Sequence, residues 1–482
     1  MKRLITITLM LAGICASAQT NGALTGDILD EIAKGYENSP SDKALRNALN
    51  QVPLATLAIN ADNAAMIDTH FSDCVRTKGI TDQKSSGRCW LFTGLNVLRA
   101  AAIDKYGLDE LEFSQTYCFF WDQLEKCNLF LQSVIDTRKK PITDREVDWL
   151  FSNPLSDGGT FTGVANLVMK YGVVPSNVMP ESYIANNTSA MSTQLKTLLR
   201  QDGLELREDP VGIKRANIPA FLQDLKVRML KEIYHVLALS YGVPPKSFEW
   251  QGKTYTPVEF YQELLGYDLE NDYVMLMNDP SRPYNKTYTI DLDRHSYDGQ
   301  QWTYLNVPME VIKEAAIKSI KDTTMMYMSC DVGKCLDRNT GILSLKNFDY
   351  ESLFQTDFPM DKADRIRTYA SASSHAMTLK AVDLAADGRR AAQAADDSAG
   401  SRTSRRHNAP LFGIITDMRT VLLFLVALTV SSAVAEKPTI ERYQSIIDRQ
   451  MFGPLPPGFD PTKSPNEVQR GSSKEEKQLT QE

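Results

Sequence analysis

Apolar residues recur at helical spacing through much of the first half of the chain. From residue 89 to residue 107 the spacing is carried by Leu91, Leu95, Leu98 and Ala102. Gly107 follows as a predicted helix stop, because glycine readily adopts the left-handed conformation that ends many helices. The same periodicity predicts helices within residues 111–131 and 164–171, and a mainly helical stretch over residues 190–270.

A strand-like pattern follows in the second half. The sequence Asp298-Gly299 is a hairpin-turn signal, and the strand-forming residues 301–304 come directly after it. Residues 373–382 alternate between polar and apolar side chains as a half-buried strand does, with His375 at the start.

Composition is that of an ordinary globular protein. The 482 residues are 43% hydrophobic and 23% charged, which suffices for one large domain or for two to three smaller ones. The net charge of −7 leaves no basic surface, so we expect no nucleic-acid partner.

Residues 1–18 have the layout of a secretory signal peptide. Lys2 and Arg3 form the charged start, residues 4–14 are mainly apolar, and Ala16-Ser17-Ala18 provides a small-residue cleavage site. We expect the mature protein to be exported, to a bacterial periplasm or to the medium.

The C-terminal part differs in composition from the rest. Residues 385–417 form a low-complexity segment of Ala, Arg, Asp and Ser, and residues 418–435 resemble a second signal peptide or a membrane segment. About 15 apolar residues are short for a membrane span, which needs about 20. Residues 436–482 are rich in Pro and charge, which predicts disorder. Two interpretations of this C-terminal part are possible. The first is a fused or frame-shifted C-terminus, and the second is a membrane anchor. We expect contact with a membrane only through residues 418–435.

Cys89 lies where a loop of small residues turns into the first predicted helix. Backbone N–H groups and the helix dipole favour negative charge at such a position, and the thiolate is the nucleophilic form of cysteine. Gln83, six residues upstream, carries an amide that is able to donate to a negative oxygen beside the sulfur. The alternative is a small buried hydrophobic residue without chemistry.

The other cysteines suggest no cofactor. Their spacings do not match zinc motifs and no histidine cluster completes a metal site, so we expect structural thiols, no metal and no cofactor. After signal cleavage the remaining cysteines are Cys74, Cys89, Cys118, Cys127, Cys330 and Cys335.

A thiol nucleophile needs a base, and histidine is the usual one. His70 precedes the nucleophile loop, and His235 lies in a helical apolar run. His295 lies among charged residues that predict a solvated loop, and His407 lies in an Arg-rich stretch. His375, at the start of a predicted strand, is the candidate base.

Gln83, Cys89 and Trp90, with glycine and small residues between the first two, resemble the nucleophile segment of papain-like cysteine peptidases. The version Ser85-Ser86-Gly87-Arg88-Cys89-Trp90-Leu91-Phe92 is similar to the bleomycin hydrolase and aminopeptidase C branch. The stretches Asp157-Gly158-Gly159, Lys170 to Pro175 and His375-Ala376-Met377 also resemble this branch, and the resemblance covers residues 19–384.

The resemblance implies an α+β fold, the two-lobed papain-like peptidase fold, with a helical insertion at roughly 190–270. It implies a cysteine-type aminopeptidase acting on peptides, in which Cys89 is the nucleophile, His375 the base and Gln83 the oxyanion donor. Gly158 and Gly159 are implied to bind substrate backbone. It also implies a homo-oligomer, a hexamer.

The sequence departs from the family after residue 384. The family's third catalytic residue is an asparagine that orients the histidine, yet residues 385–406 contain no asparagine, and Asn408 has no matching context. We therefore expect incomplete C-terminal strands, and no third triad residue is found. The alternative function is a catalytically impaired or inactive scaffold or binding protein. In the family the C-terminal tail lies in the cleft and restricts cleavage to N-terminal residues, and no matching tail is found here. The choice between aminopeptidase and endopeptidase action therefore stays open, and so does the substrate side-chain preference.

Overall fold

A computed structural model describes residues 22–36, 38–65, 70–76 and 81–384, together with the backbone of residues 390–395, 412–416 and 425–429. The chain forms two compact units, Met1–Ile59 with Phe348–Thr356, and Asn60–Asn347 with Asp357–Glu482. The predicted signal peptide 1–18 and the tail 436–482 lie outside the described residues.

The smaller unit is built from short helices. These are α2 (Gly26–Lys34), α3 (Pro40–Leu49), α4 (Leu54–Leu57) and α14 (Tyr350–Phe354). Helix α3 begins with a capping box in which Ser39 and Asp42 each accept a hydrogen bond from the other's backbone N–H. The two chain segments of this unit are joined by a β-bridge between Ile59 and Phe348.

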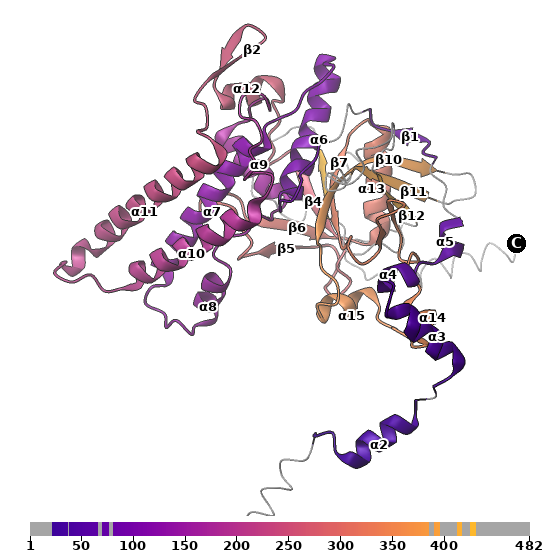
Figure 1. Cartoon of the computed structure of the whole chain (residues 1–482). Helices are drawn as coiled ribbons and strands as arrows, with labels where there is room; N and C mark the ends of the chain where they lie inside the picture. The colour runs from indigo at the N-terminus through magenta and orange to yellow at the C-terminus, as the bar shows by residue number, and fades with distance from the viewer. Residues whose placement is uncertain are drawn as a thin grey trace, which may run out of the picture. The chain divides into compact units, whose positions relative to one another are not determined.

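The larger unit combines a helical part with a sheet (Figure 1). Its helices are α5 (Ala61–Ala65), α6 (Cys89–Tyr106), α7 (Gln115–Thr137), α8 (Arg145–Ser152), α9 (Phe161–Tyr171), α10 (Thr188–Arg207), η1 (Arg215–Asn217), α11 (Ile218–Tyr241), α12 (Pro257–Leu264), α13 (Met309–Lys321) and α15 (Lys362–Arg367). Its strands are β1 (Asp73–Cys74), β2 (Phe248–Trp250), β3 (Lys253–Tyr255), β4 (Tyr273–Met277), β5 (Lys286–Ile290), β6 (Trp302–Asn306), β7 (Met326–Cys330), β8 (Leu336–Asp337), β9 (Ile342–Leu343), β10 (His375–Leu384), β11 (Arg390–Ala395), β12 (Phe412–Thr416) and β13 (Leu425–Thr429).

Helix α6 confirms the helix predicted from residue 89. It ends at Gly107, whose φ of 63° is the left-handed cap that glycine tolerates. Its apolar residues are buried nearly all round, because α6 packs against α7 and α9 on the helical side and against β7 and β10 on the sheet side. The helix is therefore the central element between the two layers.

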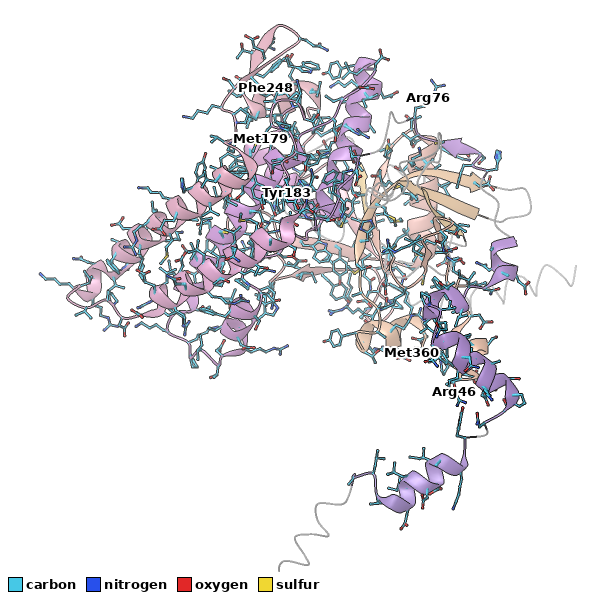
Figure 2. The ribbon with its side chains drawn as sticks, viewed as in Figure 1. Arg46, Arg76, Met179, Tyr183, Phe248 and Met360 are labelled. Atoms are coloured by element: carbon cyan, nitrogen blue, oxygen red, sulfur yellow. The ribbon has the colours of Figure 1, made fainter. Side chains whose placement is uncertain are left out.

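Helix α10 begins two residues before the predicted helical stretch 190–270, α11 lies within it, and both pack against α7 (Figure 1). Leu222, Leu225 and Met229 of α11 are buried, whereas Phe221 is 38% exposed. In Figure 2 the buried side chains Met179 and Phe248 lie among the helices of this unit.

The strands form one main sheet in the order β5-β6-β4-β13-β7-β10-β11-β12-β9-β8, and β1 also pairs with β10. Strands β4 and β7 are buried along their whole length. Strand β10 runs antiparallel to β7, with His375 opposite Cys330, and continues past β7 to pair with β11. The strand predicted at 373–382 is thus β10, and it lies inside the sheet.

Three strands come from the region beyond residue 384, where we expected unmatched sequence and incomplete strands. Strands β11 and β12 extend the sheet beyond β10, while β13 lies between β4 and β7. Residues 425–429 thus form a strand inside the segment 418–435 that we interpreted as signal-like or membrane-like. A short apolar run with β-branched residues suits a strand flanked by two buried neighbours. No helix among the described residues is long and apolar enough to cross a membrane.

Candidate active site

Cys89 is the first residue of α6, and the loop before it is held tightly. The Arg88 guanidinium is fully buried and donates two hydrogen bonds to the Glu181 carboxylate, at 3.1 and 2.7 Å. A Cβ on Gly87 would lie 2.6 Å from the Cβ of Asp157, so only glycine fits there. These contacts fix the half-buried Cys89 sulfur at the positive end of a helix.

His375 approaches from the sheet. As the first residue of β10 it is anchored by the pairing with β7, and its carbonyl accepts a hydrogen bond from the Ser329 hydroxyl at 3.1 Å. Helix α6 packs against both β7 and β10. The start of the helix and the start of the strand border the same space.

That space is a cavity of about 690 Å³. Its lining includes every site residue predicted from the sequence: Gln83, Cys89, Gly158, Gly159 and His375. Chain segments separated by almost 300 residues therefore meet at one hollow, which is polar and rich in hydroxyl groups.

Gln83 is almost fully buried at the wall of this cavity. Its Nε2 donates to the Ser86 carbonyl at 2.7 Å, and the Ser86 hydroxyl donates back to the Gln83 carbonyl at 2.6 Å. An amide nitrogen carries two N–H groups, so one is left for a second acceptor.

The Gly158–Gly159 loop also lines this cavity. The Trp90 indole N–H donates to the Asp157 carbonyl at 2.7 Å, which ties this loop to the residue next to Cys89. Among the described residues, neither the N–H nor the carbonyl of Gly159 has a hydrogen-bond partner. An unpaired backbone donor and acceptor at a cavity wall suit an extended peptide.

The comparisons with known proteins agree with this geometry. Residues 23–406 match the model of the Peptidase C1-like family. The chain belongs to this family. It is 35% identical to aminopeptidase C of Lactobacillus delbrueckii subsp. lactis over 373 residues, 75% of this chain and 82% of the relative. It is 37% identical to aminopeptidase G of the same organism, over 75% of this chain and 84% of the relative.

A solved structure of pepw from Lactobacillus rhamnosis shares the fold, with a TM-score of 0.77, 29% identity, and coverage of 89% of this chain and 95% of that one. The predicted family, the α+β papain-like fold and the assignment as a cysteine-type peptidase, a hydrolase, are thus confirmed.

His295 corrects one interpretation of the sequence. We expected a solvated loop, but the ring is only 4% exposed and its Nδ1 lies 2.6 Å from Oδ1 of the buried Asp122. The charged residues Asp291 and Asp293 before it are exposed, so the chain turns inward only at the histidine. In the structure this ring fills the space beside Gly159 and Gly163, where a Cβ would lie 2.2 or 2.4 Å from it.

Asp122 also binds the Lys126 ammonium at 2.8 Å. Burial raises the pKa of the Asp122 carboxyl, but the neighbouring Lys126 and His295 outweigh this effect and hold the pKa below its usual range. This pair follows i, i+4 spacing on α7, in a run otherwise rich in aromatic residues. It is invisible to a search for catalytic motifs.

Cys118, Cys127 and Cys330 are buried, whereas Cys89 is half-buried. None of the six cysteines that the structure describes is in a disulfide. Burial raises the pKa of Cys118 to about 12, so this thiol stays protonated and unreactive, as a structural cysteine does.

No asparagine is among the described residues that line the cavity. Asn408, the weak candidate for the third triad residue, lies outside the described residues.

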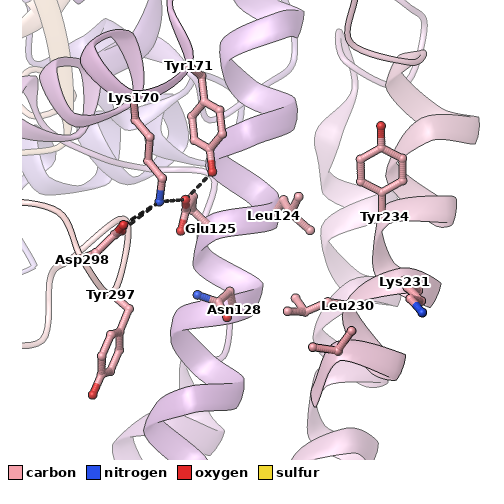
Figure 3. A pocket seen from close by; sticks show the side chains of 11 residues that line it. Leu124, Glu125, Asn128, Lys170, Tyr171, Leu230, Lys231, Tyr234, Tyr297 and Asp298 are labelled. Carbon is pink, nitrogen blue, oxygen red and sulfur yellow. Dashed lines mark hydrogen bonds and ion pairs between the residues drawn. The ribbon is translucent and has the colours of Figure 1, made fainter. Parts of the chain in front are cut away.

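A second cavity of about 550 Å³ lies beside α7, α9 and α11 (Figure 3). Its ionisable groups bind one another: the Lys170 ammonium contacts Glu125 at 2.6 Å and Asp298 at 2.8 Å. None of the described residues in its lining is a cysteine, serine or histidine.

Proposed function

We propose that this peptidase acts as an aminopeptidase on peptide substrates, with Cys89 as nucleophile and His375 as general base. The observation that carries the proposal is that both residues line one cavity, Cys89 at the start of α6 and His375 at the start of β10. The relatives are named aminopeptidases C and G, which supports the N-terminal mode of action.

The chemistry follows from these positions. The Cys89 thiolate attacks the peptide carbonyl carbon, and the carbonyl electrons move onto oxygen. The second Gln83 N–H and the Cys89 backbone N–H stabilise that oxyanion. The protonated His375 gives its proton to the leaving amine as the thioester forms. Water, deprotonated by His375, then hydrolyses the thioester and restores the thiolate.

The Gly158–Gly159 loop binds the substrate backbone in this scheme. The unpaired N–H and carbonyl of Gly159 suit the pairing of an extended chain, and glycine lets that chain approach closely. The pairing of β10 with β7 holds the His375 backbone at the cavity.

The test compares aminoacyl-fluorogenic substrates with their N-acetylated forms. We expect hydrolysis of the free-amine form by the parent protein and loss of hydrolysis in Cys89→Ala and His375→Ala. Faster cleavage of the acetylated form would contradict the aminopeptidase mode but keep the peptidase. A folded protein that cleaves neither form, and whose Cys89 resists alkylation at mildly acidic pH, would instead be the inactive scaffold.

We also propose that the protein is exported and self-associates. Support comes from the signal-like residues 1–18 and from the family resemblance, which implies a hexamer. Cell fractionation with N-terminal sequencing tests export: cleavage after Ala18 is expected, and an intact N-terminus in the cytoplasm contradicts it. Salt-resistant membrane fractionation would favour an anchored protein. Light scattering on the purified protein tests assembly, and a monomeric mass would rule it out.

A further inference from the structure

The loop that carries Gly158 is held from beneath by buried donors. Lys126 Nζ donates to the Ser156 carbonyl at 2.9 Å and to the Gly158 carbonyl at 2.7 Å. Gln123 Nε2 reaches the Ser156 carbonyl at 3.3 Å, and the Trp90 indole donates to the carbonyl between them. Three successive carbonyls are thus bound on the inner side, while the backbone groups of Gly159 stay unpaired at the cavity.

The ammonium at the centre of this support is itself fixed. The Lys126 side chain is 8% exposed and pairs with the fully buried Asp122 carboxylate. The other oxygen of that carboxylate is taken by His295 Nδ1. A buried ammonium needs such a partner, since an unpaired charge there would be strongly disfavoured.

The same group of side chains contacts the nucleophile segment. The Trp90 ring packs edge-on against the His295 ring with centroids 4.6 Å apart, and Lys126 Nζ lies 5.2 Å from the Trp90 ring centroid. The His295 ring also fills the space directly behind Gly159. Both walls of the cavity therefore rest on one buried network.

We propose that Lys126, held by Asp122 and His295, is a positioning residue that sets the Gly158–Gly159 backbone for peptide binding. The inference rests on the proposed function in one respect, namely that peptides bind along this loop. None of the three side chains lines the catalytic cavity, so none takes part in the chemical step directly. A network with a merely structural role would affect stability and leave peptide affinity unchanged.

The test measures binding of a peptide analogue whose scissile amide is replaced by a methyleneamine, so that Cys89 cannot cleave it. Iodoacetamide alkylates Cys89, and a bound peptide slows that reaction, so the peptide concentration that gives half-protection reports affinity. The double variant Asp122→Asn/Lys126→Met removes one positive and one negative charge together, so neither side chain of the ion pair is left without its partner. We expect half-protection to need about tenfold more peptide, because lost backbone contacts weaken binding. The alkylation rate without peptide should stay within about twofold.

A matched control is Glu125→Gln/Lys170→Met. It removes another lysine–carboxylate pair between α7 and α9, at the second cavity and away from the loop (Figure 3). We expect its half-protection to equal that of the parent. Trp90→Phe provides an independent variant that keeps an aromatic ring but removes the donor to Asp157, and its half-protection should rise about fivefold.

Each outcome decides the matter. The positioning role is overturned if the peptide concentration for half-protection is unchanged in the folded double variant. If the double variant does not fold, an unchanged concentration in Trp90→Phe has the same meaning. A parallel fall of the peptide-free alkylation rate overturns it too, because the network would then act on Cys89. Failure of peptide to protect the parent would refute peptide binding at the loop. A parent that is protected but does not hydrolyse would refute only the proposed activity.

Discussion

Alanine at Gly159 and alanine at Gly158 should differ sharply in their effect on stability. A Cβ at Gly159 would lie 2.2 Å from His295 Cε1 and 2.7 Å from Trp90 Cδ2, and both rings are buried. The histidine is not free to move aside, because its Nδ1 is bound to Asp122. A Cβ at Gly158 would meet only the Ser156 hydroxyl, at 3.3 Å, on an exposed side chain.

The magnitude follows from overpacking. Inserting a methyl into a well-packed site costs about 1–3 kcal/mol, and the rigid contacts put Gly159→Ala near 3 kcal/mol. Gly158→Ala should change stability by less than about 0.5 kcal/mol. Both substitutions restrict the unfolded chain equally, so that contribution cancels in the comparison.

Urea unfolding followed by tryptophan fluorescence and by far-UV circular dichroism measures the difference. We expect the free energy of unfolding of Gly159→Ala to be about 2–3 kcal/mol lower than that of Gly158→Ala, with equal m-values for the two variants. A difference under about 1 kcal/mol would refute the claim that the His295 ring fixes the space behind Gly159. Gly163→Ala supplies a further check, since its Cβ meets the same ring at 2.4 Å. The double variant Gly159→Ala/Gly163→Ala should then lose less stability than the sum of the losses in the two single variants, because one displaced ring serves both positions.

Three further predictions concern buried charge. Burial and the nearby Glu232 and Glu205 raise the pKa of Asp202 to about 6, so the unfolded chain loses this proton at a lower pH than the folded protein, and stability falls between about pH 4 and pH 6. Asp202→Asn should therefore raise the free energy of unfolding by about 1 kcal/mol at pH 7 and by nothing near pH 4, measured as urea midpoints. An equal gain at both pH values would contradict this. Burial lowers the pKa of Lys362 to about 8, so between pH 8 and about 10 the unfolded chain binds more protons than the folded protein. The free energy of unfolding should therefore rise with pH over this range, and the rise should be smaller in Lys362→Met. Arg88→Lys keeps the positive charge but loses one of the two hydrogen bonds to the Glu181 carboxylate. This substitution should lower the midpoint temperature of unfolding and slow alkylation of Cys89. Unchanged values would show that the contact does not hold the loop before Cys89.

Local sequence patterns predicted the elements that carry the reacting groups. The helical spacing after Cys89 and the glycine stop at residue 107 give the two ends of α6, and the alternation after His375 gives β10. These patterns succeed because each depends on a face or cap formed by neighbours in the chain. The family motifs then predicted that Gln83, Gly158 and Gly159 belong to the same site, and all line its cavity.

The same local logic failed at His295, and at residues 425–429 composition alone left the kind of element open. The charges before His295 predict solvent, but burial of the ring depends on a helix more than 160 residues earlier in the chain, and such pairing leaves no periodic trace. The apolar run of β13 fits a membrane segment and a buried strand equally well by composition. Only the presence of β4 and β7 on either side distinguishes them.

The reacting groups and their support therefore differ in kind. A nucleophile at a helix start and a base at a strand start need only short motifs, because the ends of elements place them. The loop that faces them depends on a lysine, an aspartate and a histidine from α7 and from the loop after β5, joined by contacts of 2.6–2.9 Å. Substitutions in that network should alter how well peptides bind before they alter the chemistry of Cys89. Peptide affinity in this protein is thus expected to vary with residues that no catalytic motif contains.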